Sequence, residues 1–123
     1  MSDNVVTSGE VLRRYEMGER VFRDLEVEDP PGEAPLRGET LDGIDFTGSF
    51  LVVDFTGASL QGAVFRANVK TCAFDRCDLT EADFRGAALD AATFRGATLR
   101  GARFEGAHTH GYSFGADEPP DVD

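Results

Sequence analysis

The sequence of 123 residues contains no tryptophan, only two cysteines and five prolines, and few basic residues, 12 against 23 acidic ones. Cys72 and Cys77 are too few for a disulfide framework and lack metal-ligand spacing. No apolar run is long enough to cross a membrane, and no charged-then-apolar signal segment opens the chain. These absences predict one domain, cytoplasmic and without membrane association.

The formal net charge of −11 suggests a basic partner or imitation of nucleic acid, but its distribution weakens that reading. Residues 1–33 hold nine Asp or Glu against four Arg, and residues 117–123 hold four acids and no base. Residues 34–116 hold ten acids and eight bases. The acidity therefore belongs to the two ends, and direct nucleic-acid binding is not expected.

Leu or Phe recurs at every fifth position for most of the chain, with a small residue two places before it. This is seen at Leu79, Phe84, Leu89, Phe94, Leu99 and Phe104, preceded by Cys77, Ala82, Ala87, Ala92, Ala97 and Ala102. Neither a helix nor a plain strand has a period of five. Two inward residues separated by one outward residue form a short extended segment. The remaining two, often ending in Gly, turn the chain. The repeat therefore predicts a solenoid with a filled interior.

Two shortened units indicate how many sides close one turn. Phe46 is followed by Phe50, and Phe65 by Val69, so the two defects are separated by four units, one of them shortened. Val27, at the same separation before Phe46, would mark a third. A defect recurring every four units at one corner predicts a four-sided coil. The predicted inward columns are Leu41/Leu60/Leu79/Leu99, Phe46/Phe65/Phe84/Phe104, Phe50/Val69/Leu89/Thr109 and Phe55/Phe74/Phe94/Phe114.

Ala82-Asp83-Phe84-Arg85-Gly86 and Ala67-Asn68-Val69 resemble the A(D/N)LxG unit of the pentapeptide-repeat family. This resemblance covers residues 34–116 strongly and 22–33 weakly, and it implies a right-handed quadrilateral β-helix. Counted from Phe22, about five coils at ~4.8 Å each give a rod about 24 Å long. We expect an all-β solenoid at 22–116, an N-terminal tail and capping α-helix at 1–21, and an acidic disordered tail at 117–123.

The N-terminal helix is expected over residues 7–17. Thr7 and Glu10 have capping-box spacing, Val6 and Val11 have hydrophobic-staple spacing, and Gly18 is a C-terminal stop. Its expected role is to cover the first coil and block an exposed sheet edge, the alternative being a partner-binding helix. A loop at Asp29–Glu33 interrupts the first coil.

The C-terminal end shows no matching helix. Tyr112 and Phe114 would sit at the mouth of the last coil. Either the acidic tail covers this edge, or it is the interface of a homodimer.

Two outward features are candidate interaction surfaces. The first is apolar and consists of Leu51, Val52 and Val64, unless the N-terminal segment covers them. The second is basic and consists of Arg95, Arg100 and Arg103, which would dock the acidic tail or an acidic partner.

No catalytic, cofactor or metal site is expected. Residues four units apart along the chain lie on adjacent coils, and this spacing pairs Asp83 with Arg103, Arg85 with Glu105, Asp75 with Arg95, and Asp90 with Lys70 and His110. Such exposed pairs set register between coils. His108 and His110 lack a third metal ligand, and the two cysteines should behave as small buried hydrophobes.

The sequence thus favours a non-enzymatic protein-binding module whose partner is a protein of unknown identity. Regulation or neutralisation of a neighbouring protein, as in immunity proteins, falls within this class. The alternative comes from the resemblance. Some bacterial pentapeptide-repeat proteins mimic DNA, bind a type II topoisomerase such as DNA gyrase and modulate quinolone sensitivity. A near-neutral body matching only about seven base pairs at ~3.4 Å each disfavours that alternative.

Overall fold

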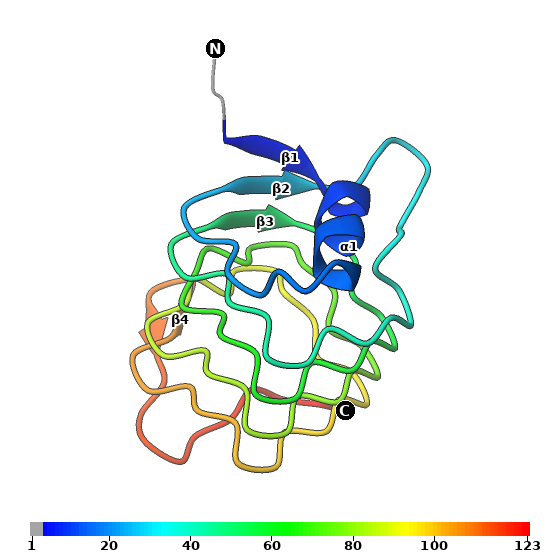
Figure 1. Ribbon diagram of the computed structural model, residues 1–123. Helices are drawn as coiled ribbons and strands as arrows, with labels where there is room; N and C mark the ends of the chain where they lie inside the picture. The colour runs from blue at the N-terminus through cyan, green and yellow to red at the C-terminus, as the bar shows by residue number, and fades with distance from the viewer. Residues whose placement is uncertain (1–3) are drawn as a thin grey trace.

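The computed structural model describes residues 4–123 and shows a stack of coils with a helix at its N-terminal end (Figure 1). The elements are β1 (Val5–Thr7), α1 (Ser8–Glu16), β2 (Glu26–Glu28), β3 (Phe50–Val52), β4 (His108–Thr109) and β5 (Tyr112–Ser113). β1, β2 and β3 form a parallel sheet in that order, whereas β4 and β5 pair antiparallel. Most of the remaining sides of the coils meet their neighbours through single bridges.

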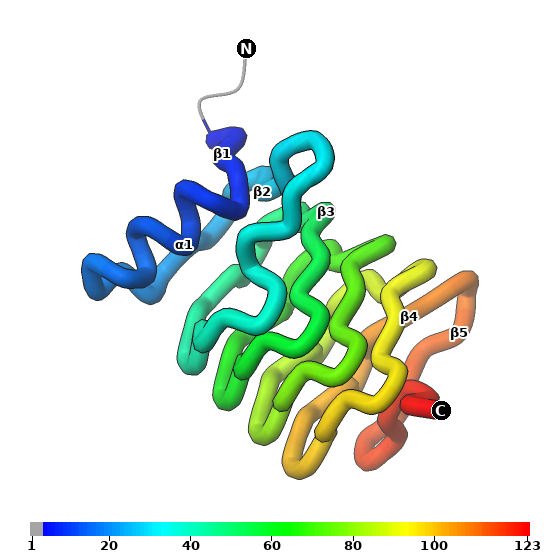
Figure 2. The backbone as a smooth tube through the Cα atoms, turned by 90° about the vertical axis from the view of Figure 1, so that its right-hand side faces the viewer, coloured from blue at the N-terminus to red at the C-terminus, as the bar shows by residue number. Residues whose placement is uncertain are grey.

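Parallel bridges between positions one coil apart in the chain hold successive coils side by side (Figure 2). One column runs Asp45, Val64, Asp83 and Arg103. Asp83 illustrates the ladder, because its N–H donates to the carbonyl of Ala63 over 2.9 Å and its carbonyl accepts from Phe65 N–H over 2.7 Å. The predicted four-column spacing is therefore present in the backbone pairing.

The interior is a double stack of phenylalanine rings, as the columns predicted. Phe65 and Phe84 stack with centroids 4.9 Å apart and planes 12° from parallel. Phe74 meets Phe84 edge-on at 5.3 Å and 90°. Both geometries are ones that aromatic pairs favour. Every coil thus contacts the next through rings as well as through backbone hydrogen bonds.

Left-handed backbone at the corners explains the glycines between the short extended segments. Gly62, for example, has φ 68°, a conformation that costs glycine little. Thr71 and Ala91 stand at equivalent corners with φ 65° and 62°. These side chains carry a steric cost that glycine would avoid.

The inward register at β3 differs from the expected one. Leu51 is fully buried, whereas Phe50 is 46% exposed, so the prediction that Phe50 faces the core and Leu51 faces solvent is wrong. Leu51, Val53 and Phe55 are buried at alternate positions along the chain. The first short unit therefore runs from Leu51 to Phe55 and not from Phe46 to Phe50. The second short unit, Phe65 to Val69, is confirmed, with Ala67 buried between them. The two defects therefore occupy different corners, and the prediction of a shared corner is wrong.

The first coil is longer than the others. Phe22 rather than Val27 lies on Phe46, with ring centroids 6.0 Å apart, and Val27 pairs with Leu51. This wider separation in the chain arises because the loop after β2 adds residues, as its Asp-Pro-Pro-Gly sequence indicated. The predicted placement of Val27 over Phe46 is therefore wrong.

The N-terminal helix is confirmed at Ser8–Glu16. Thr7 is its N-cap and accepts a hydrogen bond from Glu10 N–H over 3.2 Å, and Gly18 follows the last turn with φ 105°. Val11 is fully buried, and Tyr15 donates from its hydroxyl to the Asp42 carbonyl over 2.7 Å. Sequence analysis missed β1, which joins the sheet ahead of the helix. The predicted 1–21 segment is described only from residue 4 onward.

The C-terminal tail, expected to be disordered, packs against the last coil. β4 and β5 reverse the chain, and Phe114 O accepts from Gly106 N–H over 2.9 Å. Val122 is partly buried, and its carbonyl accepts from Gly96 N–H over 2.7 Å. In earlier coils these corner N–H groups donate to the following coil, as Gly86 does to Glu105. The reversed chain at Phe114 and the tail at Val122 therefore supply acceptors that a further coil would otherwise provide.

Candidate interaction surfaces

The outer face of the β1–β3 sheet carries a mixed acidic and apolar surface. We call the outward side chains of Val5, Glu26, Glu28, Phe50 and Val52 the acidic–apolar patch. Val5, Glu26 and Phe50 are in register on adjacent strands, and Glu28 is in register with Val52. The three apolar members are 44%, 46% and 45% exposed in chain order. Glu26, Glu28, Phe50 and Val52, with Val27, line a shallow groove of about 250 Å³.

Phe50 is the unusual member of this patch. All ten phenylalanines lie within the described residues, and Phe50 alone among them is exposed. Asn68 and Ala88 occupy its column on the next two coils. The equivalent positions on these coils therefore carry a polar and a small side chain. A large apolar ring exposed to solvent within an apolar patch is typical of a contact surface.

The negative charge of the patch is not neutralised locally. The four arginines before β2 are engaged elsewhere: Arg13 and Arg14 pair with Glu10 at 2.7 and 3.0 Å, and Arg23 pairs with Asp45 at 2.8 Å. Arg20 lies over the Tyr15 ring, 3.7 Å from its centroid. Within residues 4–123 no basic side chain lies within 4.0 Å of the Glu26 or Glu28 carboxylate. Both carboxylates thus rely on solvent.

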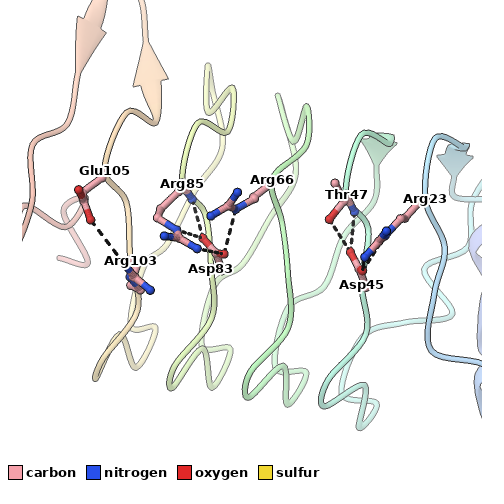
Figure 3. Close-up of polar contacts among 8 residues, drawn as sticks. All are labelled: Arg23, Asp45, Thr47, Arg66, Asp83, Arg85, Arg103 and Glu105. Carbon is pink, nitrogen blue, oxygen red and sulfur yellow. Dashed lines mark hydrogen bonds and ion pairs between the residues drawn. The ribbon is translucent and has the colours of Figure 1, made fainter.

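A second charged surface follows the Asp45–Arg103 column and is internally paired (Figure 3). Asp83 accepts from Arg66 and Arg85, each over 3.0 Å. Burial of this carboxyl raises its pKa, but hydrogen bonds from Arg85 and Arg66 outweigh that effect and lower the pKa to about 2. Arg103 pairs with Glu105 at 3.8 Å. These acidic and basic side chains pair with one another, so little unpaired charge remains on this surface for a partner.

The predicted charge pairs are correct only in part. Lys70 and Asp90 form an ion pair at 3.7 Å, and Asp90 accepts from the backbone N–H of His110 over 2.7 Å. Asp75 accepts from the backbone N–H of Arg95 over 3.2 Å. Asp83, however, forms ion pairs with Arg66 and Arg85. The prediction that Arg103 pairs with Asp83 and Arg85 with Glu105 is therefore wrong.

The predicted apolar surface does not form as proposed. Leu51 is buried, and Val64 lies partly buried in the Asp45–Asp83 column, away from the strand that carries Val52. Val52 instead joins Phe50 and Val5. Sequence analysis missed Phe50 because it placed a shortened unit between Phe46 and Phe50, which assigned Phe50 to the core.

The predicted basic residues are distributed along the last full coil. Arg103 lies in the Asp83 column, whereas Arg95 and Arg100 precede two successive corners at Gly96 and Gly101. Arg95 lines a pocket together with Asp121 and Asp123, so the tail does lie beside one of the three predicted arginines.

That pocket, about 430 Å³, is lined by residues of both the tail and the last coil. Phe114 lines it and packs against Phe104 and Tyr112, at 6.4 and 5.3 Å between ring centroids. Tyr112 is 50% exposed and donates its hydroxyl to Glu118, which raises the pKa of Tyr112. The tail therefore contacts this end of the stack through Glu118, and its role as a homodimer surface stays a prediction.

The cysteines are buried, as predicted. Burial raises the pKa of both Cys72 and Cys77 to about 12, and their Sγ atoms lie 3.2 and 2.9 Å from the carbonyls of Leu51 and Phe55. Over residues 4–123 no three His, Cys, Asp or Glu side chains gather as metal ligands, and no helix is long and apolar enough to span a membrane.

Comparison with known proteins identifies the repeat. Residues 72–108 match the family model of pentapeptide repeats in eight copies. The predicted resemblance is confirmed over residues 72–108, which carry pentapeptide repeats. These repeats imply a right-handed quadrilateral β-helix.

Solved structures similar to the chain are also pentapeptide repeat proteins. One, alr5209 from Nostoc Pcc 7120, is 27% identical with a TM-score of 0.45, over 96% of this chain and 93% of that chain. A protein from the Arabidopsis thaliana thylakoid lumen is 28% identical with a TM-score of 0.27, over 66% and 75%. HetL from Nostoc sp. strain PCC 7120, involved in heterocyst differentiation regulation, is 16% identical with a TM-score of 0.21, over 85% and 77%. No curated protein matches the chain.

Proposed function

We propose that this protein is a non-enzymatic scaffold that binds a partner protein through the acidic–apolar patch. The observation that carries the proposal is the exposure of Phe50 beside Val52 in a groove on the outer face of the sheet. Aromatic side chains in such positions supply much of the binding energy at protein interfaces. The regular backbone ladder beneath holds the patch rigid, which lowers the entropic cost of binding.

The remaining surface supports a binding role over catalysis. Asp45, Asp54 and Asp78 each accept a hydrogen bond from the hydroxyl of the threonine two residues later. Asp83 is held by arginines, so these carboxylates have structural partners. The same Asp–Arg pairing weighs against the DNA-mimic alternative, since a duplex mimic needs unpaired acidic groups along the rod.

Site-specific photocrosslinking in the source organism tests the proposal. A benzophenone analogue of phenylalanine replaces Phe50 in one variant and Ala88, in the same column two coils away, in a matched control. We expect a discrete protein adduct from position 50 that position 88 does not give. Competition by the unlabelled protein, but not by its folded Phe50→Ser variant, would show that the ring makes the contact. No adduct at position 50, or equal adducts at both positions, would refute the proposal.

Regulation of the partner follows as the expected consequence. A rigid scaffold that covers part of a partner changes what that partner can bind. Activity of the crosslinked partner, measured with and without the purified protein, determines whether the scaffold inhibits or neutralises it.

A further inference from the structure

We infer that the partner segment seated on the acidic–apolar patch presents Lys or Arg side chains beside an apolar side chain. This inference rests on the proposed function and specifies the chemistry of the partner. It arises from the negative charge of the patch, which no basic side chain among residues 4–123 neutralises within 4.0 Å.

A partner that covers the apolar side chains of the patch must also cover the carboxylates of Glu26 and Glu28. Glu26 lies between Val5 and Phe50 across the strands, and Glu28 lies beside Val52. Both glutamates project from β2 at alternate positions, about 7 Å apart along the strand. A partner that buries Phe50 and Val52 therefore also removes water from Glu26 and Glu28.

Loss of water decides which partners are favourable. A carboxylate taken out of water without a counter-charge is strongly disfavoured, whereas one that meets Lys or Arg regains hydrogen bonds and charge. A purely apolar, acidic or anionic partner would leave two unpaired carboxylates at the contact. Nucleic acid and anionic membranes are disfavoured for the same reason.

The local surroundings strengthen this conclusion. The arginines that could neutralise the patch already hold Glu10, Tyr15 or Asp45. Glu26 also sits where a β-branched residue would pack better between Val5 and Phe50. A position that is suboptimal for the fold, in a region of surplus negative charge, is consistent with selection for binding.

Neutralising the two glutamates tests the inference separately from the proposed function. In the position-50 photocrosslinking background, Glu26→Gln with Glu28→Gln keeps size and hydrogen-bonding capacity but removes charge. The matched control is Glu16→Gln, an exposed glutamate at the end of α1. We expect the double variant to weaken partner binding at least tenfold and to flatten its salt dependence, while the control changes it less than twofold. Circular dichroism confirms that each variant is folded.

A zero-length carbodiimide reaction supplies the second readout. This reagent joins a carboxylate to a lysine amine in direct contact, so an adduct through Glu26 or Glu28 identifies the partner's basic residue. If that residue is arginine, charge reversal restores binding: Glu28→Lys loses it and an Arg→Glu change in the crosslinked partner segment regains it.

The outcomes separate the two proposals. If position 50 crosslinks the partner but the double variant binds equally well, or the adduct segment lacks Lys and Arg, the inference is wrong and the scaffold role stands. If position 50 gives no adduct, both fail. If the adduct is a nucleic acid or lipid, the partner chemistry proposed here is wrong.

Discussion

Replacement of Phe65 by alanine gives a quantitative test of the stacked core. Phe65 is fully buried and stacks between Phe46 at 5.6 Å and Phe84 at 4.9 Å, with two further rings edge-on. Truncation of a buried phenylalanine usually costs about 3–5 kcal/mol. Because backbone ladders hold the neighbouring coils apart, the cavity cannot close, and we expect the upper part of this range. That is about a third or more of the stability of an ordinary domain, ~5–15 kcal/mol.

Phe50→Ala is the matched control, because it makes the same chemical change at a ring that is 46% exposed. It should lower the free energy of unfolding by less than about 1 kcal/mol, since no enclosed cavity forms. Urea denaturation followed by far-UV circular dichroism measures both variants at one pH and salt concentration. Equal losses of stability in the two variants, or a larger loss for Phe50→Ala, would refute the stacked core and the inward–outward register together.

Four further predictions concern single features of the structure. Thr71→Gly removes a β-branched side chain from a corner with φ 65° and should raise the free energy of unfolding by about 0.5–1 kcal/mol, seen as a higher urea midpoint; a decrease would contradict the left-handed corner. Because the pKa of Asp83 is lowered from 3.8 to about 2, its contribution to stability is present above about pH 4 and is lost as pH falls toward 2. Asp83→Asn should therefore lose less stability between pH 5 and 2 than the unchanged protein, and an identical slope would refute this. Burial raises the pKa of the two cysteine thiols to about 12, so Ellman's reagent at pH 8 should label them only in urea, and prompt labelling of the folded protein would contradict their placement. Val122→Asp should detach the tail and speed hydrogen exchange at Gly96 N–H at least tenfold, whereas unchanged protection would show that the tail does not hold this group.

The repeat could be predicted closely from sequence because its signals are local. The small residue, the outward residue and Leu or Phe alternate along one extended segment, and glycine marks the corner that follows. Stacking of Phe65 on Phe84 then follows from their separation by four units. The helix beginning after Thr7 was equally predictable, since a cap depends on residues three apart.

The candidate site was less predictable because it depends on one choice of register. Phe50, Leu51, Val52 and Val53 are consecutive apolar residues, and either alternating pair could face inward. The five-residue period favours Leu51 when counted on from Phe46 and Phe50 when counted back from Phe55, and the second count was the one adopted. In the structure Leu51 faces inward instead, and it pairs with Val27 on β2. A one-residue shift moves every side chain to the other face of a strand, so this error exchanged the core and surface roles of Phe50 and Leu51.

The sequence by itself determined the four-sided repeat, its aromatic columns, its corners and the N-terminal helix, because each depends on residues close in the chain or at a constant spacing. Only the tertiary structure decided that Phe50 joins Val5 and Glu26 on one surface and that Val122 packs back onto the last coil. Those contacts depend on the length of an irregular loop and on a chain reversal. The loop and the chain reversal each occur at one place in the chain, so the five-residue period cannot predict the contacts that they produce.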